Sequence, residues 1–425
     1  MARYAPRVLI VIASVVAENT LSKLMTTLEN RLDGNVSSTV LARYGQVGHQ
    51  VRKTQRVADS KIDPDRFESL TADFCQYSQA RLESNHQHKI EDMGKKAKHP
   101  IWQRLTRELR AHYTQNCRGF FTYNDHKPRW NPDIWGWNEH GDFKGTTRAQ
   151  ISRLSSSPRF KSWYANAVMW EPVGAPQQVI VPPGSEHAEI ITSAKTADAL
   201  TLVDTCATAF PAISLLELDA VYEFGAGTTA VARVFQDGSY RGSYIIYDMP
   251  EMTIMQQYYL RVAAVAAISA TSTLKSEHIE QFRAGVTLTQ SIGEFITSLQ
   301  YLSSGSKAAL FYATYSFSES PVDERARFLE AMLGKITHYF IVFASKPRQT
   351  WAGATADDRW GGNFAYFRTA FKNGLFGPPD VLHFCLWPRE KQGQPAGYVL
   401  AASTTEEVAC PETTIFESKR LNGAQ

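Results

Sequence analysis

The chain has 425 residues, of which 43% are hydrophobic and 20% are charged. These values are typical of a folded soluble protein with room for one large domain or two. The formal net charge of +3 at pH 7 is too small to indicate nucleic acid by itself, although residues 1–150 carry 23 Lys and Arg against 16 Asp and Glu. That basic part is either a solvated face or the side that meets an anionic partner.

The five cysteines bear on the compartment. Their number is odd and they form no CxxC pair, which favours reduced thiols in a cytosol-like compartment and argues against structural zinc. We therefore expect a cytoplasmic protein without a metal site. The five positions are Cys75, Cys117, Cys206, Cys385 and Cys410.

The first residues resemble the core of a short signal peptide. Arg3 and Arg7 precede an apolar run at residues 8–17. This run is too short to span a membrane. Because apolar residues continue at helical spacing to residue 28, we expect a buried helix or strand, with a cleaved leader as the alternative.

Residues 1–184 are expected to form a mainly helical N-terminal domain. Residues 67–93 and 101–113 carry apolar side chains at every third or fourth position, which indicates helices. Residues 119–143 differ, because seven aromatic residues lie there among Asn, Asp, Gly and Pro. This aromatic-rich loop either stacks on a sugar or ring, or is held down by its own rings. Residues 174–184, rich in Pro and Gly, predict the linker to a second domain at 185–425.

Apolar runs of strand length alternate with helical stretches from residue 185 onward. This alternation predicts a parallel sheet with helices on both faces. A short turn at residues 388–396 joins the last two runs, so the seventh strand should be antiparallel. The expected strands are Ala220–Phe224, Ser243–Tyr247, Gly285–Thr289, Ala308–Ala313, Tyr339–Phe343, Val381–Leu386 and Tyr398–Ala402.

The most informative segment follows the first of these strands. Glu223 precedes a glycine turn (residues 225–229, Gly-Ala-Gly-Thr-Thr), and the next strand ends at Asp248. Glycine lets a ligand approach the backbone, and the following helix N-terminus can bond a carboxylate. An acid at the tip of the neighbouring strand can accept hydrogen bonds from two ribose hydroxyls. The alternatives are an ordinary strand-to-helix turn and an acid that caps the helix beginning at Pro250.

This pattern resembles motif I of the class I S-adenosylmethionine (SAM)-dependent methyltransferases. The runs Asp-Met-Pro-Glu at 248–251 and Ser-Phe-Ser-Glu at 316–319 are similar to segments of the sugar O-methyltransferase family, over roughly residues 215–350. The resemblance implies SAM as the cofactor and an α/β fold, a seven-stranded class I methyltransferase (Rossmann-like) sheet preceded by the helical domain. Thr229 stands where many relatives have a third glycine, and it narrows the turn. The implied cofactor-binding residues are Glu223, Gly225, Gly227, Thr228, Thr229, Asp248 and Met249.

The resemblance places the acceptor at the end of the fourth strand, where Glu319 and Ser316 are the expected catalytic residues. The Glu319 carboxylate can take the proton of an attacking hydroxyl, or it can cap the helix that follows Pro321. His338 and His383 are expected to be satisfied core residues.

The implied function is O-methyl transfer from SAM to a hydroxyl of a sugar or another small molecule. One alternative is methylation of an RNA or cap-like nucleotide, because the basic and aromatic N-terminal part allows stacking and phosphate contact. A second is a catalytically inactive structural subunit, since a fold does not fix a function. The oligomeric state is not indicated.

Overall fold

A computed structural model of the chain describes part of its length. The chain divides into two compact units, Met1–Arg56 and Val57–Gln425, and every described residue belongs to the second. The apolar run at 8–17 and residues 119–142 of the aromatic-rich loop lie outside the described residues, and the predicted boundary after residue 184 stays a prediction. The described residues are 69, 72–80, 109–111, 113, 143–157, 159, 178–181, 190–258, 260, 285–300, 308–343, 363–391 and 394–417.

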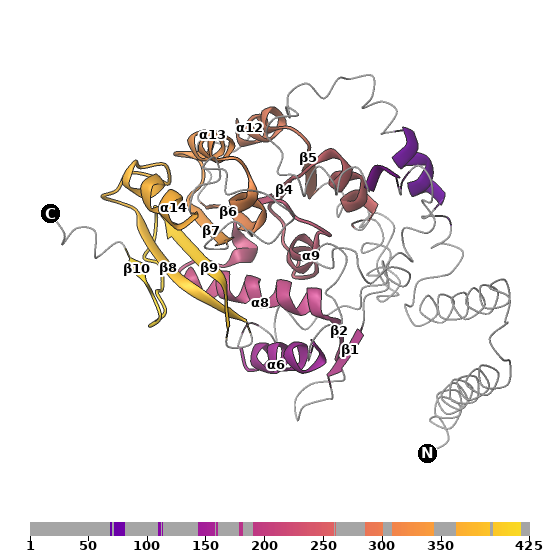
Figure 1. Cartoon of the computed structure of the whole chain (residues 1–425), viewed down its shortest axis with the longest axis horizontal. Coiled ribbons are helices and arrows are strands. Elements are labelled where there is room, and N and C mark those ends of the chain that lie inside the picture. Colours follow the sequence, from indigo (N-terminus) through magenta and orange to yellow (C-terminus); the bar gives the residue numbers. More distant parts are fainter. Residues whose placement is uncertain are drawn as a thin grey trace, which may run out of the picture. The chain divides into compact units, whose positions relative to one another are not determined.

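An eight-stranded sheet forms the centre of the second unit (Figure 1). Its strands are β3 (Ala220–Phe224), β4 (Ser243–Tyr247), β5 (Val286–Thr289), β6 (Ala309–Thr314), β7 (His338–Phe343), β8 (His383–Lys391), β9 (Gln394–Ser403) and β10 (Phe416–Glu417). Their order across the sheet is β10-β8-β9-β7-β6-β3-β4-β5. Strands β3 to β7 pair in parallel, and β9 is antiparallel to both β7 and β8.

The strand order reverses direction beside β3, which has β4 on one side and β6 on the other. A crevice for ligands forms at such a reversal, beyond the carboxyl ends of the strands. This order, with the antiparallel seventh strand inserted next to the fifth, is that of the class I methyltransferase fold. The predicted fold is confirmed, and β10 adds a two-residue strand at one edge.

Helices cover both faces of the sheet (Figure 1). One face packs against α8 (Ala194–Ala209) and α9 (Ala230–Asp237), with α6 (Phe143–Ser155) packed on α8, and the other against α12 (Ile292–Gln300), α13 (Val322–Met332) and α14 (Asn363–Lys372). Side chains alternate between the faces, so that Leu310 and Tyr312 meet the first set while Phe311 meets the second. All residues of β3 and β7 are buried, which explains why their sequences are mostly apolar.

Two predicted connections contain strands instead of loops. The predicted linker includes β1 (Gln178–Val181), which pairs antiparallel with β2 (Ile190–Ser193). The predicted turn at 388–396 is mostly hairpin, with Pro388 opposite Tyr398 and a bulge after Arg389. Proline lacks a backbone N–H and is tolerated at an edge. Within the described residues, β10 pairs with β8 at Cys385 and Leu386, both of which precede Pro388.

The expectation that all five thiols are reduced is wrong. Cys385 and Cys410 form a disulfide with their Cα atoms 5.6 Å apart, and Cys75 is also disulfide-bonded. Cys206 is free and buried. Cys385 lies on β8, and Cys410 lies 25 residues later, on the segment after β9. The antiparallel hairpin of β8 and β9 brings them together.

Candidate functional site

The glycine turn follows β3 and is tied to the end of β4. Gly225 and Gly227 both have positive φ, at 71° and 56°, and the Gly225 N–H donates to the Tyr247 carbonyl at 2.8 Å. A Cβ added at Gly225 would collide with the side chain of Ser316, whereas one added at Gly227 would have no atom within 4 Å. The turn is therefore packed against Ser316 on one side and open at Gly227.

The two threonines of the turn are buried and differ in their contacts. Thr229 adopts the left-handed conformation, with φ 61°, just before α9, which costs a β-branched residue about 1 kcal/mol or more. Its hydroxyl donates to the Thr228 carbonyl at 2.6 Å. The Thr228 hydroxyl oxygen is buried and has no hydrogen-bond partner in the described part of the chain.

Glu223 is held beneath the turn by the neighbouring strand. Its side chain is buried, and the Tyr244 hydroxyl donates to its Oε2 at 2.7 Å. Burial and the nearby Glu223 charge raise the pKa of Tyr244 well above its usual value, so this phenol stays protonated. The bond fixes one carboxylate oxygen of Glu223 on the α8 and α9 face of the sheet.

Asp248 follows β4, and its buried carboxylate accepts hydrogen bonds from the backbone and from a side chain. Oδ1 accepts from the Met249 N–H at 2.8 Å and Oδ2 from the Gln256 amide at 2.6 Å. The same amide nitrogen donates to the Gly227 carbonyl at 3.1 Å, so Gln256 bridges Asp248 and the glycine turn. Burial raises the pKa of Asp248 to about 7, against the lowering effect of hydrogen bonds from Met249, Gln256 and the Gly227 backbone, and Glu251 raises it further.

The segment after β6 carries both predicted catalytic residues. It forms the short helix η4 (Ser316–Glu319) after Tyr315, which has a strained φ of 63°. The Ser316 hydroxyl lies 3.3 Å from the Gly225 carbonyl and 3.4 Å from that of Thr314. Ser316 is thus placed against the glycine turn, while Glu319 is half-buried at the end of η4.

The position of η4 depends on Arg325, which the sequence analysis did not single out. This fully buried guanidinium on α13 donates to the carbonyls of Ser318 at 2.6 Å and Ser320 at 2.8 Å, and to Asn363 Oδ1 at 2.9 Å. Burial lowers the pKa of Arg325 to about 10, and Glu319 is among the groups that raise it. A cation therefore acts electrostatically on the predicted base.

A second polar cluster lies beside Tyr315. The Arg389 guanidinium on β8 donates to the Tyr315 hydroxyl at 2.7 Å and to Asp198 on α8 at 2.6 Å. Burial alone would lower the pKa of Arg389, but Asp198 and Tyr315 outweigh it and the pKa is raised. No sequence signal identified this cluster, because Arg389 fell within a predicted turn and Asp198 within an ordinary helix.

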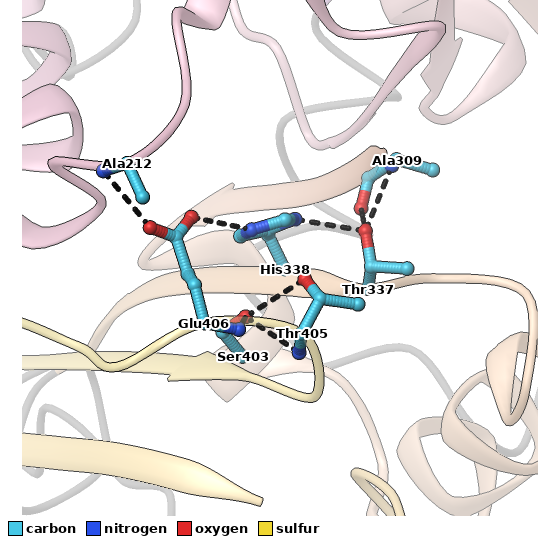
Figure 2. Close-up of polar contacts among 7 residues, drawn as sticks. All are labelled: Ala212, Ala309, Thr337, His338, Ser403, Thr405 and Glu406. Carbon is cyan, nitrogen blue, oxygen red and sulfur yellow. Dashed lines mark hydrogen bonds and ion pairs between the residues drawn. The ribbon is translucent and has the colours of Figure 1, made fainter. Parts of the chain in front are cut away.

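His338 is a satisfied core residue, as predicted (Figure 2). The same prediction is wrong for His383, which is exposed at the start of β8. Its Nε2 lies 2.7 Å from Glu406 Oε1, and its Nδ1 lies 2.8 Å from the Thr337 hydroxyl. Glu406 also accepts from the Ala212 N–H at 3.0 Å, and Thr337 bonds the backbone of Ala309. His338 begins β7, whereas the glycine turn follows the carboxyl end of the parallel strand β3. The two therefore lie at opposite ends of the parallel strands.

Across the described residues, no group of three or more His, Cys, Asp or Glu is arranged to hold a metal ion. No helix in the same part of the chain has both the length and the apolar character needed to cross a membrane.

Comparisons with known proteins find similar solved structures only. No protein-family model and no curated protein matches the chain. A candidate O-methyltransferase from Klebsiella pneumoniae is 12% identical, with 52% of this chain and 91% of that chain covered and a TM-score of 0.30. Magnesium protoporphyrin IX methyltransferase from Synechocystis PCC 6803, with bound S-adenosylhomocysteine (SAH), is 12% identical, with 48% and 82% covered and a TM-score of 0.31. An O-methyltransferase family protein from Burkholderia thailandensis is 12% identical, with 78% and 96% covered and a TM-score of 0.26. Values this low carry no argument about activity, and the fold assignment rests on the strand order.

Proposed function

We propose that the chain is a SAM-dependent O-methyltransferase whose cofactor lies over the glycine turn. The observation that carries this proposal is the Gln256 bridge, which fixes the Gly227 carbonyl and the Asp248 carboxylate relative to one another. The open side of Gly227 leaves room for a ligand. Next to it, the buried Thr228 hydroxyl has no described partner, and such a group is costly unless a ligand or water pairs with it.

Asp248 fits the ribose role although both of its oxygens already accept a hydrogen bond. An ionised carboxylate offers about four acceptor positions, and the hydrogen bonds from Met249, Gln256 and the Gly227 backbone do not use all of them. A ribose hydroxyl can donate to the carboxylate at a remaining position. Met249, half-buried beside Asp248, would pack against the adenine ring.

When bound, SAM supplies a methyl group on a sulfonium, which passes to the acceptor oxygen while the hydroxyl proton leaves to a base. Glu319 is the carboxylate on η4 that would take this proton. Ser316 already directs its hydroxyl at backbone carbonyls, so its oxygen is left to accept from, and orient, the acceptor. Correct alignment of the oxygen contributes at least as much as the base.

The proposed acceptor is a hydroxyl of a sugar or another small molecule. This choice rests on the Ser-Phe-Ser-Glu segment at 316–319 and its resemblance to sugar O-methyltransferases. The cytoplasmic location expected from the sequence is not part of the proposal, because its premise of reduced thiols does not hold at Cys385 and Cys410.

The decisive experiment is calorimetry with SAH, followed by incubation with methyl-labelled SAM and extracts of the source organism. The proposal expects saturable SAH binding and label in a small molecule or glycan. Failure to bind either SAM or SAH would leave only the inactive structural subunit. Label in RNA would instead support the nucleotide acceptor.

The base is tested by Glu319→Gln. We expect SAH affinity to stay unchanged and turnover to fall by about a hundred-fold or more, with a smaller loss at high pH where the acceptor hydroxyl ionises more readily. Glu330→Gln on the exposed side of α13 is the matched control. Turnover equal to that of the control would remove Glu319 from the mechanism.

A further inference from the structure

Two N-terminal helical segments pack onto the helix that follows Asp248. Residues 72–80 contribute Phe74, residues 109–111 and 113 contribute Tyr113, and residues 250–258 contribute Tyr258. The Phe74 ring lies 5.7 Å from the Tyr113 ring and 4.9 Å from the Tyr258 ring, measured between centroids. All three side chains are buried, so these segments belong to the core beside the proposed cofactor site.

Two polar contacts from the same segments converge on Glu251. The Tyr113 hydroxyl donates to the Glu251 carbonyl at 2.8 Å. The Arg110 guanidinium contacts Glu251 Oε1 through both Nε and Nη2, each at 2.5 Å. Glu251 is 1% exposed and Arg110 38% exposed, so a buried carboxylate is neutralised by a cation that still reaches solvent.

Glu251 matters because it acts on Asp248. Its negative charge is among the effects that raise the pKa of Asp248, after burial. Besides Glu251, the titratable groups in the described part of the chain that interact electrostatically with Asp248 are Tyr113 and Tyr247. Burial raises the pKa of each phenol far above neutrality, so both tyrosines stay uncharged. Burial and the hydrogen bonds to its carboxylate act most strongly on the pKa of Asp248, and Glu251 is the charged residue that adds to them.

We infer that Arg110 is a positioning residue of the cofactor site, which keeps the Asp248 carboxylate charged by neutralising Glu251. The inference rests on the proposed function, because it assigns this role for binding of the cofactor ribose. An ionised Asp248 accepts from a ribose hydroxyl, whereas a protonated one gives up an acceptor position. The N-terminal segments thus complete a site whose other parts lie more than a hundred residues later.

The test is SAH affinity as a function of pH, measured by calorimetry from pH 5.5 to 9. Affinity of the wild-type protein should rise with pH through the ionisation of Asp248. Arg110→Met exposes Asp248 to the full Glu251 charge and should move the midpoint up by about half a pH unit or more. Glu251→Gln removes that charge and should move the midpoint down.

The fold-changes follow from the ionised fraction. A midpoint that moves from about 7 to about 7.5 weakens binding about twofold at pH 7 and hardly at all at pH 9. Arg110→Lys should restore the wild-type midpoint, and the double variant Arg110→Met with Glu251→Gln should resemble Glu251→Gln alone. Arg153→Met, at an exposed position on α6, is the control for loss of a positive charge.

Opposite shifts of the two single variants support the inference. Equal weakening at every pH, with unmoved midpoints, would overturn it and leave Arg110 a merely structural contact. If Glu251→Gln does not fold, the comparison of Arg110→Met with Arg110→Lys decides alone. Absence of SAH binding by the wild-type protein at all pH values would overturn the proposed function as well, which distinguishes the two failures.

Discussion

At the scale of single residues, the two glycines of the turn have different reasons to be glycine. Both require positive φ, which costs other residues about 1–2 kcal/mol. Only at Gly225 would an added Cβ also collide with the Ser316 side chain. We expect Gly225→Ala to destabilise the protein more than Gly227→Ala in urea unfolding. In calorimetry Gly227→Ala should weaken SAH binding, because its methyl enters the open side. Equal stability losses would contradict the assigned contact.

Asp248 carries the prediction with the clearest pH dependence. Burial raises its pKa to about 7, so it is ionised above that pH and protonated below. Asp248→Asn removes the charged acceptor, and the loss of a charge-assisted hydrogen bond should cost about 1.5–3 kcal/mol, or roughly ten- to a hundred-fold in SAH affinity at pH 8. The rise of affinity between pH 6 and 8 should also disappear. A pH profile parallel to that of the wild-type protein would mean that another group titrates.

At the scale of elements, the strand prediction succeeds where burial is complete. The predicted bounds of β3 and β4 are those observed, because each is a short apolar run that ends at a glycine or an acid. The prediction is too short at β8 and β9. There Pro388 and the glycines indicate a turn by local preference, and the edge position of β8 allows a proline within a strand.

The helix η4 provides the prediction at this scale. Three hydrogen bonds from buried Arg325 hold its C-terminal end against α14. Arg325→Met should cost roughly 3–5 kcal/mol in urea unfolding, because it leaves buried carbonyls unpaired. Arg325→Lys keeps the positive charge but lacks the planar guanidinium that makes the three hydrogen bonds. Because η4 is then less well positioned, turnover should fall even where the protein folds. Arg327→Met, on the exposed side of the same helix, is the control and should change neither quantity.

At the scale of the whole molecule, the sequence predicts the topology but not the long-range polar contacts. The glycine turn and Asp248 are adjacent in the predicted sheet, and their proximity follows from parallel strand order. The bridge from Gln256 to Gly227 spans 29 residues, and the pair of Arg389 and Asp198 spans 191. Such pairs depend on how the helices pack on the sheet. The spacing of apolar residues along the sequence does not specify that packing.

One of these long-range contacts makes the stability of the fold depend on pH. His338 and Glu406 lie 68 residues apart and join β7, the segment after β9 and the Ala212 backbone (Figure 2). Burial lowers the pKa of His338 below its usual 6.5, and Glu406 opposes this only in part. The unfolded chain therefore binds a proton at higher pH than the folded protein, so acid favours unfolding.

We therefore expect stability to fall as the pH drops below about 6.5, by at most about 1.4 kcal/mol per pH unit from this one group. His338→Asn removes the titrating ring and should flatten the dependence of the free energy of unfolding on pH between 7 and 5. His383→Asn, at an exposed position, should leave it unchanged. A stability that rises on acidification in the wild-type protein, and not in His338→Asn, would show that the attraction of Glu406 for the charged imidazole outweighs burial.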